Sequence, residues 1–128
     1  NRRTYPWGFE DFELIEYHRY LIDLHKKLPA LRRGSLKQLL ADRQLIVYGR
    51  MSGENKCAVI INNRGESRSV RVPVWELGIT DEDAITRMML SDEKGYNAGR
   101  IDYRADHGWL TLDVPAHSGV LLSSGALV

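Results

Sequence analysis

Hydrophobic periodicity changes once along this chain, at Gly34, and this change constrains the fold more than any other feature of the sequence. Before Gly34, apolar and histidine side chains recur at three- and four-residue steps, which is the spacing of one helical face. After Gly34, no segment has a convincing helical period. We therefore expect a single helix followed by an all-β region. The positions on the predicted helical face are Leu14, Ile15, His18, Leu21, Ile22, His25 and Leu28.

The helix is expected over residues 10–28. Asp11 supplies negative charge at its start, and Lys26 and Lys27 supply positive charge in its last turn. The helix dipole favours these signs at the two ends. Pro29 follows and predicts the end of the helix, because proline cannot continue the backbone hydrogen-bond ladder.

The region after Gly34 is predicted to form about eight short strands. Turn residues separate them about every 8–12 residues, a spacing typical of a β-sandwich or Greek-key barrel. Residues 52–55 and 62–65 are each expected to join neighbouring strands as a hairpin turn. The continuous apolar run 58–61 predicts a central strand covered on both sides. The alternation over 110–114 predicts a strand with one solvent-facing side. The expected strands are 36–40, 44–51, 56–62, 67–72, 84–90, 100–103, 109–114 and 119–123.

Charge and cysteine usage exclude several classes of function. The chain has 18 basic and 17 acidic residues and a net charge of +1, whereas a dedicated nucleic-acid binder usually has a basic excess. No apolar stretch approaches the ~18 residues that a membrane span needs, and no segment resembles a signal peptide. The single cysteine, Cys57, cannot form an internal disulfide, and its place at the start of an apolar run predicts a buried side chain.

Titratable side chains form no pattern typical of a catalytic or metal site. The acidic residues around 10–13 are interpreted as helix-start charge. The acidic run 81–83 would suit a calcium ion by charge alone, but a turn capped by Thr80 is the favoured interpretation. His18 and His25 are seven residues apart, whereas metal-binding pairs on one helix are usually three or four apart, so both are expected to be buried or half-buried. No catalytic residue, metal or cofactor is expected in this chain.

Trp75 and Trp109 allow two interpretations. Aromatic rings often stack on the apolar faces of sugars, which makes both residues sugar-stacking candidates. Both also fit positions in the core or at the edge of a sandwich, and this is the favoured interpretation. An exposed ring with another aromatic residue nearby would favour sugar binding.

Four stretches of the sequence resemble a known family. Residues 1–8 (Asn-Arg-Arg-Thr-Tyr-Pro-Trp-Gly) resemble the segment after the eighth barrel strand of the α-amylase superfamily, closest to its neopullulanase, cyclomaltodextrinase and amylopullulanase branch. Residues 21–34 resemble that family's last barrel helix and its exit, although His25 stands where many relatives have arginine. Residues 59–63 and 112–119 resemble two strands of the family's C-terminal β domain.

The resemblance implies a division of the chain into two parts. Residues 1–32 would be the terminal loop and last helix of a (β/α)₈ barrel, and residues 33–128 a Greek-key β-sandwich. A complete barrel needs about 250 residues, and the family's catalytic aspartate, glutamate and second aspartate would lie upstream of Asn1. The chain, which does not begin with methionine, is thus expected to be a cut piece of a longer enzyme.

The implied parent is a retaining α-glucan hydrolase acting on starch, pullulan or dextrins, and either a cytoplasmic or a secreted bacterial parent fits. This piece would stabilise the catalytic barrel as its partner; an accessory starch-binding module is the alternative. Tyr5 and Trp7 would lie at the top of the barrel as candidates for the substrate rim. Without the barrel, the apolar face of helix 10–28 would pack on the sandwich or on a second copy of the chain.

Overall fold

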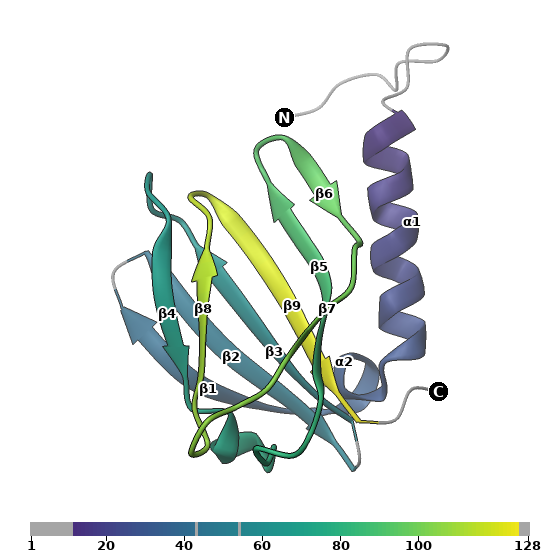
Figure 1. The fold of residues 1–128 in the computed structure, drawn as a ribbon. Helices are drawn as coiled ribbons and strands as arrows, with labels where there is room; N and C mark the ends of the chain where they lie inside the picture. Colours follow the sequence, from purple (N-terminus) through teal and green to yellow (C-terminus); the bar gives the residue numbers. More distant parts are fainter. Residues whose placement is uncertain (1–11, 43, 54, 126–128) are drawn as a thin grey trace.

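The structure is a computed structural model that describes residues 12–42, 44–53 and 55–125, and side chains from residue 16 onward. The described residues form two α-helices, one short 3₁₀ helix and nine strands (Figure 1). The elements are, in chain order, α1 (Phe12–Lys27), α2 (Pro29–Arg33), β1 (Ser35–Asp42), β2 (Leu45–Ser52), β3 (Asn55–Asn62), β4 (Arg68–Val72), η1 (Val74–Leu77), β5 (Ile85–Asp92), β6 (Gly95–Asn97), β7 (Ile101–Tyr103), β8 (Leu110–Val114) and β9 (Ser118–Ser124).

The strands form a β-sandwich of unequal layers. The larger sheet has seven strands in the order β1-β2-β3-β9-β5-β6, with β7 also paired to β5, and the smaller sheet is the pair β4-β8. Every strand pair is antiparallel. Figure 1 shows the β4–β8 pair in front of the larger sheet and α1 alongside β5 and β6. The predicted fold class, one main helix before a Greek-key sandwich, is confirmed.

The main core lies between the two sheets. Strand β8 alternates buried Leu110, Leu112 and Val114 with exposed Thr111 and Asp113, which confirms the predicted solvent-facing side. The buried side chains face apolar residues of β2, β3, β4 and β9. Complete burial of each valine or leucine contributes about 1.5–3 kcal/mol. These facing residues are Leu45, Val47, Ala58, Ile60, Val70, Val72, Val120 and Leu122.

A second apolar cluster lies between α1 and the opposite side of the larger sheet. Leu24 of α1 and Leu28, which lies between α1 and α2, are 1% and 0% exposed. They pack with residues of β3, β5 and β9, so these central strands have apolar side chains on both faces. Of the two arrangements predicted for the helix, on the sandwich or on a second copy, the structure shows the first. The strand residues of this cluster are Cys57, Met88, Met89 and Leu121.

The helix is rotated relative to the predicted face. Tyr17, Tyr20 and Leu24 turn toward the sheet. His18 and His25 are exposed, so the prediction that both histidines are buried or half-buried was wrong. The reason is that apolar side chains occupy two overlapping stripes of α1. Periodicity along the sequence gives the width of the apolar surface, but the shape of the partner sheet selects which stripe is buried.

Aromatic stacking holds the helix at this rotation. Tyr96 of β6 stacks on Tyr17 at a ring-centroid distance of 5.0 Å and on Tyr20 at 5.7 Å. The hydroxyl of Tyr20 also donates a hydrogen bond to the backbone carbonyl of Met88 in β5. The short β5–β6 hairpin, whose strand β6 was not predicted, therefore anchors α1.

The turn at 62–65 does not form the predicted hairpin. Strand β3 pairs with β2 and β9, and β4 pairs with β8, so the chain crosses between the sheets at this turn. Buried Asn62 explains the crossing. Its side-chain amide donates to the carbonyls of Val114 and Pro115, 3.3 and 3.0 Å away, and its Oδ1 accepts from the N–H of Arg64 at 3.0 Å. The turn is thereby tied to the end of β8.

A compact corner connects the helix to the sheet. The helix α1 ends before Pro29, as predicted, but Pro29 begins the unexpected short helix α2, where a missing N–H costs nothing. Asn55 accepts a hydrogen bond from the N–H of Ala30 and donates to Ser123. A Cβ at Gly34 would lie 2.3 Å from the carbonyl oxygen of Ala30, so only glycine fits the exit from α2.

Candidate interaction surfaces

The face of the larger sheet that points away from the β4–β8 pair, termed the outer face below, carries apolar side chains. Side chains alternate along a strand, so Ile46 and Tyr48 point opposite to the core residue Val47. Ile46 lies opposite Ile61 across the β2–β3 ladder. Leu36 of β1 lies opposite Arg50 and is on the same face.

Much of this outer face is uncovered within the described part of the chain. Leu36 is 68% exposed, Ile46 46% and Ile61 41%. A shallow hollow of about 370 Å³ lies over β1 and β2. An antiparallel sheet that faces water normally has polar side chains on that face. The hollow is lined by Leu36, Gln38, Ile46, Tyr48 and Arg50.

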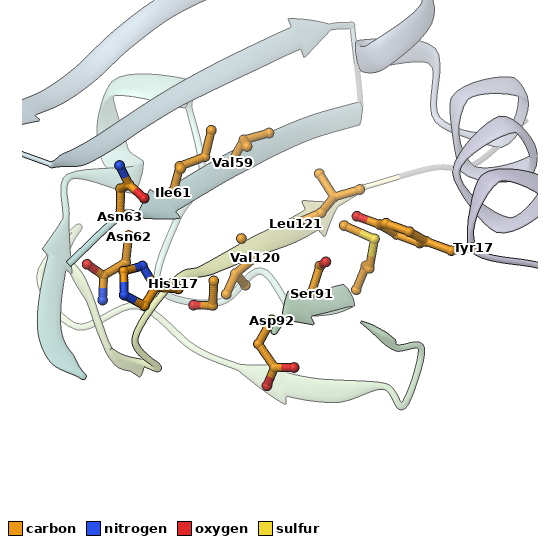
Figure 2. A pocket seen from close by; sticks show the side chains of 13 residues that line it. Tyr17, Val59, Ile61, Asn62, Asn63, Ser91, Asp92, His117, Val120 and Leu121 are labelled. Atoms are coloured by element: carbon orange, nitrogen blue, oxygen red, sulfur yellow. The ribbon is translucent and has the colours of Figure 1, made fainter. Parts of the chain in front are cut away.

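A second hollow, of about 390 Å³, lies between α1 and the sheet (Figure 2). Tyr17 lines it from the helix, and Val59, Ile61 and Leu121 line it from the sheet. Because Ile61 also faces Ile46, the second hollow adjoins the uncovered strip on β2. Together the two hollows form one largely apolar surface beside α1.

In Figure 2, Asn62, Asn63 and His117 lie at the end of the second hollow farther from α1, and Ser91 and Asp92 line it closer to the helix. His117 has its Nε2 3.7 Å from Oε1 of Glu93, and its backbone N–H donates to the carbonyl of Arg64 at 3.0 Å. The hollow therefore has an apolar middle and a polar rim. The rim side chains that line it are Asn63, Ser91, Asp92 and His117.

Trp75, a sugar-stacking candidate, lies in η1 at the end of the sandwich. Its side chain is 56% exposed. Its backbone N–H donates to the carbonyl of Gly108 at 3.0 Å. A Cβ at position 108 would lie 2.9 Å from the Cβ of Trp75, so glycine is needed for this contact.

Trp109, the other sugar-stacking candidate, is the residue after Gly108. It is half-buried, and the guanidinium carbon of Arg71 lies 4.2 Å from its ring centroid. Asp106 and Trp109 exchange two backbone hydrogen bonds and enclose His107 and Gly108, whose φ angles are +52° and +86°. Two positive φ angles are typical of a tight type I′ turn. The fold thus brings both tryptophans to one turn.

The acidic run 81–83 stabilises this corner. Asp81 accepts hydrogen bonds from the N–H groups of His107 and Gly108 at 2.7 and 2.8 Å. The predicted cap is reversed, because the N–H of Thr80 donates to Oδ2 of Asp83 at 2.8 Å, and this bond lowers the pKa of Asp83. A carboxylate reaches two or more donors more easily than a hydroxyl, which explains the reversal.

The remaining residues considered in the sequence analysis form no catalytic, metal or sugar-binding site among the described residues. Tyr5 and Trp7 lie outside the described residues. Cys57 is buried, as predicted, and desolvation raises its pKa to about 11, which disfavours the nucleophilic thiolate. The described residues contain no group of three or more side chains able to hold a metal ion. None of the described helices is long and apolar enough to span a membrane.

Comparisons with known proteins show which enzymes the chain resembles. No family model matches the chain. The chain is 26% identical over 138 aligned positions to the amylopullulanase of Thermoanaerobacterium thermosulfurigenes, and the alignment covers 97% of this chain but 7% of that enzyme. It is 36% identical over 67 positions to neopullulanase 2 of Thermoactinomyces vulgaris, which covers 51% of this chain and 12% of that enzyme.

A solved structure agrees at the level of fold. An α-amylase from Anoxybacillus superposes with a TM-score of 0.73 at 19% identity, over 92% of this chain and 24% of that chain. This chain therefore spans a small fraction of the proteins it resembles. The resemblance that the sequence motifs suggested is confirmed: the chain is a homologue of α-amylase-family glycoside hydrolases, and its fold matches the β-sandwich part of such enzymes.

Proposed function

We propose that this chain is a non-catalytic domain that stabilises the catalytic barrel of a longer α-glucan hydrolase by docking through the outer face. The observation that carries the proposal is the uncovered apolar surface around Ile46 and Ile61, which are 46% and 41% exposed. A contiguous apolar surface that is rimmed by polar groups is typical of an interface.

The size of the related enzymes supplies a partner for this surface. The aligned region is 7% of one amylopullulanase and 24% of one α-amylase, so in those proteins most of the chain lies outside the matching segment. Residues 1–32 would belong to the end of the barrel, and residues 33–128 would form the docked domain. The catalytic carboxylates would lie upstream, and the substrates would be starch, pullulan or dextrins.

The free energy gained by docking depends on the apolar surface area that docking removes from water. Each square ångström of apolar surface removed from water contributes about 25 cal/mol. Leu36, Ile46 and Ile61 each gain from burial against the barrel. Docking of this kind makes the two parts unfold together, so that the domain raises the heat resistance of the enzyme without contact with the substrate.

The test uses the full-length enzyme that carries this segment, with Ile46→Asp and Ile61→Asp introduced together. Charge on the docking surface should lower the Tm for loss of activity, by about 2–4 °C per kcal/mol of docking energy lost, with kcat at low temperature unchanged. The matched control is Ile101→Asp on β7, where the isoleucine is 44% exposed. Equal heat resistance of the double variant and this control would overturn the proposal.

A further inference from the structure

We propose that Trp75 and the neighbouring turn at 106–109 form a binding surface for an α-glucan chain, separate from the outer face. The ligand class rests on the proposed function, because it follows from the substrates of the proposed parent enzyme. The location of the surface does not depend on docking.

Trp75 keeps more than half of its side chain exposed in the folded chain. Its neighbours in η1, Val74 and Leu77, are 0% and 2% exposed and anchor the turn in the main core. The indole instead remains 56% exposed, although no other aromatic residue among the described side chains is a large exposed hydrophobic. A tryptophan left in this position offers a flat apolar surface with a polar N–H at its edge.

The ring is held before any ligand arrives. The backbone N–H of Trp75 donates a hydrogen bond to the carbonyl of Gly108, and the Trp75 side chain packs directly against that glycine. Asp81 in turn fixes the N–H groups of His107 and Gly108. A platform that is already ordered loses little conformational entropy on binding, which favours the weak contacts that sugars make.

The turn on which Trp75 rests also carries polar side chains. The side chains of Asp106 and His107 are 89% and 93% exposed, and Nδ1 of His107 lies 2.7 Å from Oδ1 of Asp106. Both residues precede the glycine on which Trp75 rests. A glucose unit has one apolar C–H face for an aromatic ring and hydroxyl groups at its rim for polar side chains. The corner offers both kinds of partner.

The surface lies away from the outer face. Glu76, next to Trp75, pairs with Lys37 at 3.2 Å. Lys37 lies opposite Gly49 in the β1–β2 ladder, and a Cβ at Gly49 would meet the core residue Leu77, so this is the core-facing side of the sheet. Docking through Ile46 and Ile61 on the other side therefore leaves Trp75 available to a ligand.

The test measures binding of maltoheptaose to the 128-residue chain by calorimetry or NMR titration, with cellohexaose as the β-linked control. Wild type should bind maltoheptaose in preference to cellohexaose. Trp75→Ala should weaken binding by about tenfold, since loss of ~1.4 kcal/mol of stacking corresponds to that factor. Trp75→Tyr should retain most of the affinity, because it keeps an aromatic face.

Ile46→Asp separates this proposal from docking. It should leave maltoheptaose affinity unchanged while, in the full-length enzyme, the docking surface is impaired. The glucan proposal is overturned if wild type shows no binding at about 10 mM maltoheptaose, if Trp75→Ala binds as tightly as wild type, or if cellohexaose binds equally well. None of these results bears on the heat-resistance test of docking, so each proposal fails on its own measurement.

Discussion

The two halves of the outer face differ in what covers them. Close to α1, the outer side chains of β3, β5 and β9 are covered, and Cys57, Met88 and Leu121 are 0%, 2% and 6% exposed. On β1 and β2 the outer side chains Leu36 and Ile46 are 68% and 46% exposed. Both halves carry apolar side chains, which favour burial. The described part of the chain buries only the half beside α1.

Contacts at both ends hold the helical segment over the first half. Tyr96 holds the α1 tyrosines against the β5–β6 hairpin, and Asn55 holds the start of α2 at the end of β3 and β9. These contacts fix both ends of the helical segment. With α1 held over β3, β5 and β9, the half of the outer face on β1 and β2 stays uncovered in the described part of the chain.

The largest expected effect comes from breaking the covered half. Leu24→Ala should lower the free energy of unfolding of the 128-residue chain by about 2–5 kcal/mol, because it removes a fully buried side chain and leaves a cavity under α1. Urea denaturation measures the change. Ile22→Ala is the control on the same helix, since Ile22 is 55% exposed, and it should change stability by less than about 0.5 kcal/mol. Equal effects of the two substitutions would mean that α1 is not packed by the Leu24 face.

An intermediate effect is expected from alkaline pH acting on Cys57. Burial raises the pKa of its thiol from 9.0 to about 11. Between these values the unfolded chain has released the thiol proton while the folded chain retains it, so stability falls as pH rises from 9 toward 11 and is unaffected below 9. The loss should be about 1–3 kcal/mol by urea denaturation.

Cys57→Ala is the matched variant for this measurement, because other groups also titrate at alkaline pH. Its stability should fall less steeply over the same interval. Reaction of wild type with a thiol reagent at neutral pH should be far slower than reaction of the unfolded chain. A native labelling rate equal to the unfolded rate would mean that α1 leaves the sheet open.

The smallest expected effect comes from the uncovered half. Ile46→Thr should change the stability of the 128-residue chain by less than about 0.5 kcal/mol, because a β-branched residue is kept and little buried area is lost. The same substitution should reduce binding of a dye that reports exposed apolar surface. A large loss of stability would show that Ile46 is already buried in solution, for example against a second copy of the chain, and would break the contrast between the halves.

Sequence patterns predicted where helices and strands occur better than they predicted which strands pair with one another. The helix and most strands were expected close to their observed bounds, because periods of 3.6 and 2 residues are local properties. The hairpin expected at 62–65 was wrong, because Asn62 bonds to Val114 and Pro115, more than fifty positions along the chain. No local signal distinguishes an asparagine in a hairpin turn from one that ties two sheets together.

For the candidate surfaces, too, the sequence predicted the residues involved but not how they come together. Trp75 and Trp109 could be named as aromatic candidates from residue type, but their meeting at one turn depends on Gly108 and Asp81. Tyr5 and Trp7 remain predictions outside the described residues. The apolar character of 58–61 predicted a strand covered on both sides, and the structure bears this out beneath α1 but not at Ile61.

The sequence by itself determined the main helix, most of the strands and the resemblance to α-amylase-family enzymes, because local periodicity and short motifs carry that information. Tertiary structure decided which stripe of α1 is buried, which strands pair and which apolar surface is left over. The physical reason is that burial depends on the shape of both partners. An apolar residue such as Ile22 or Leu24 has the same tendency to leave water, and only the position of Tyr96 and the sheet beneath determines which of them does so.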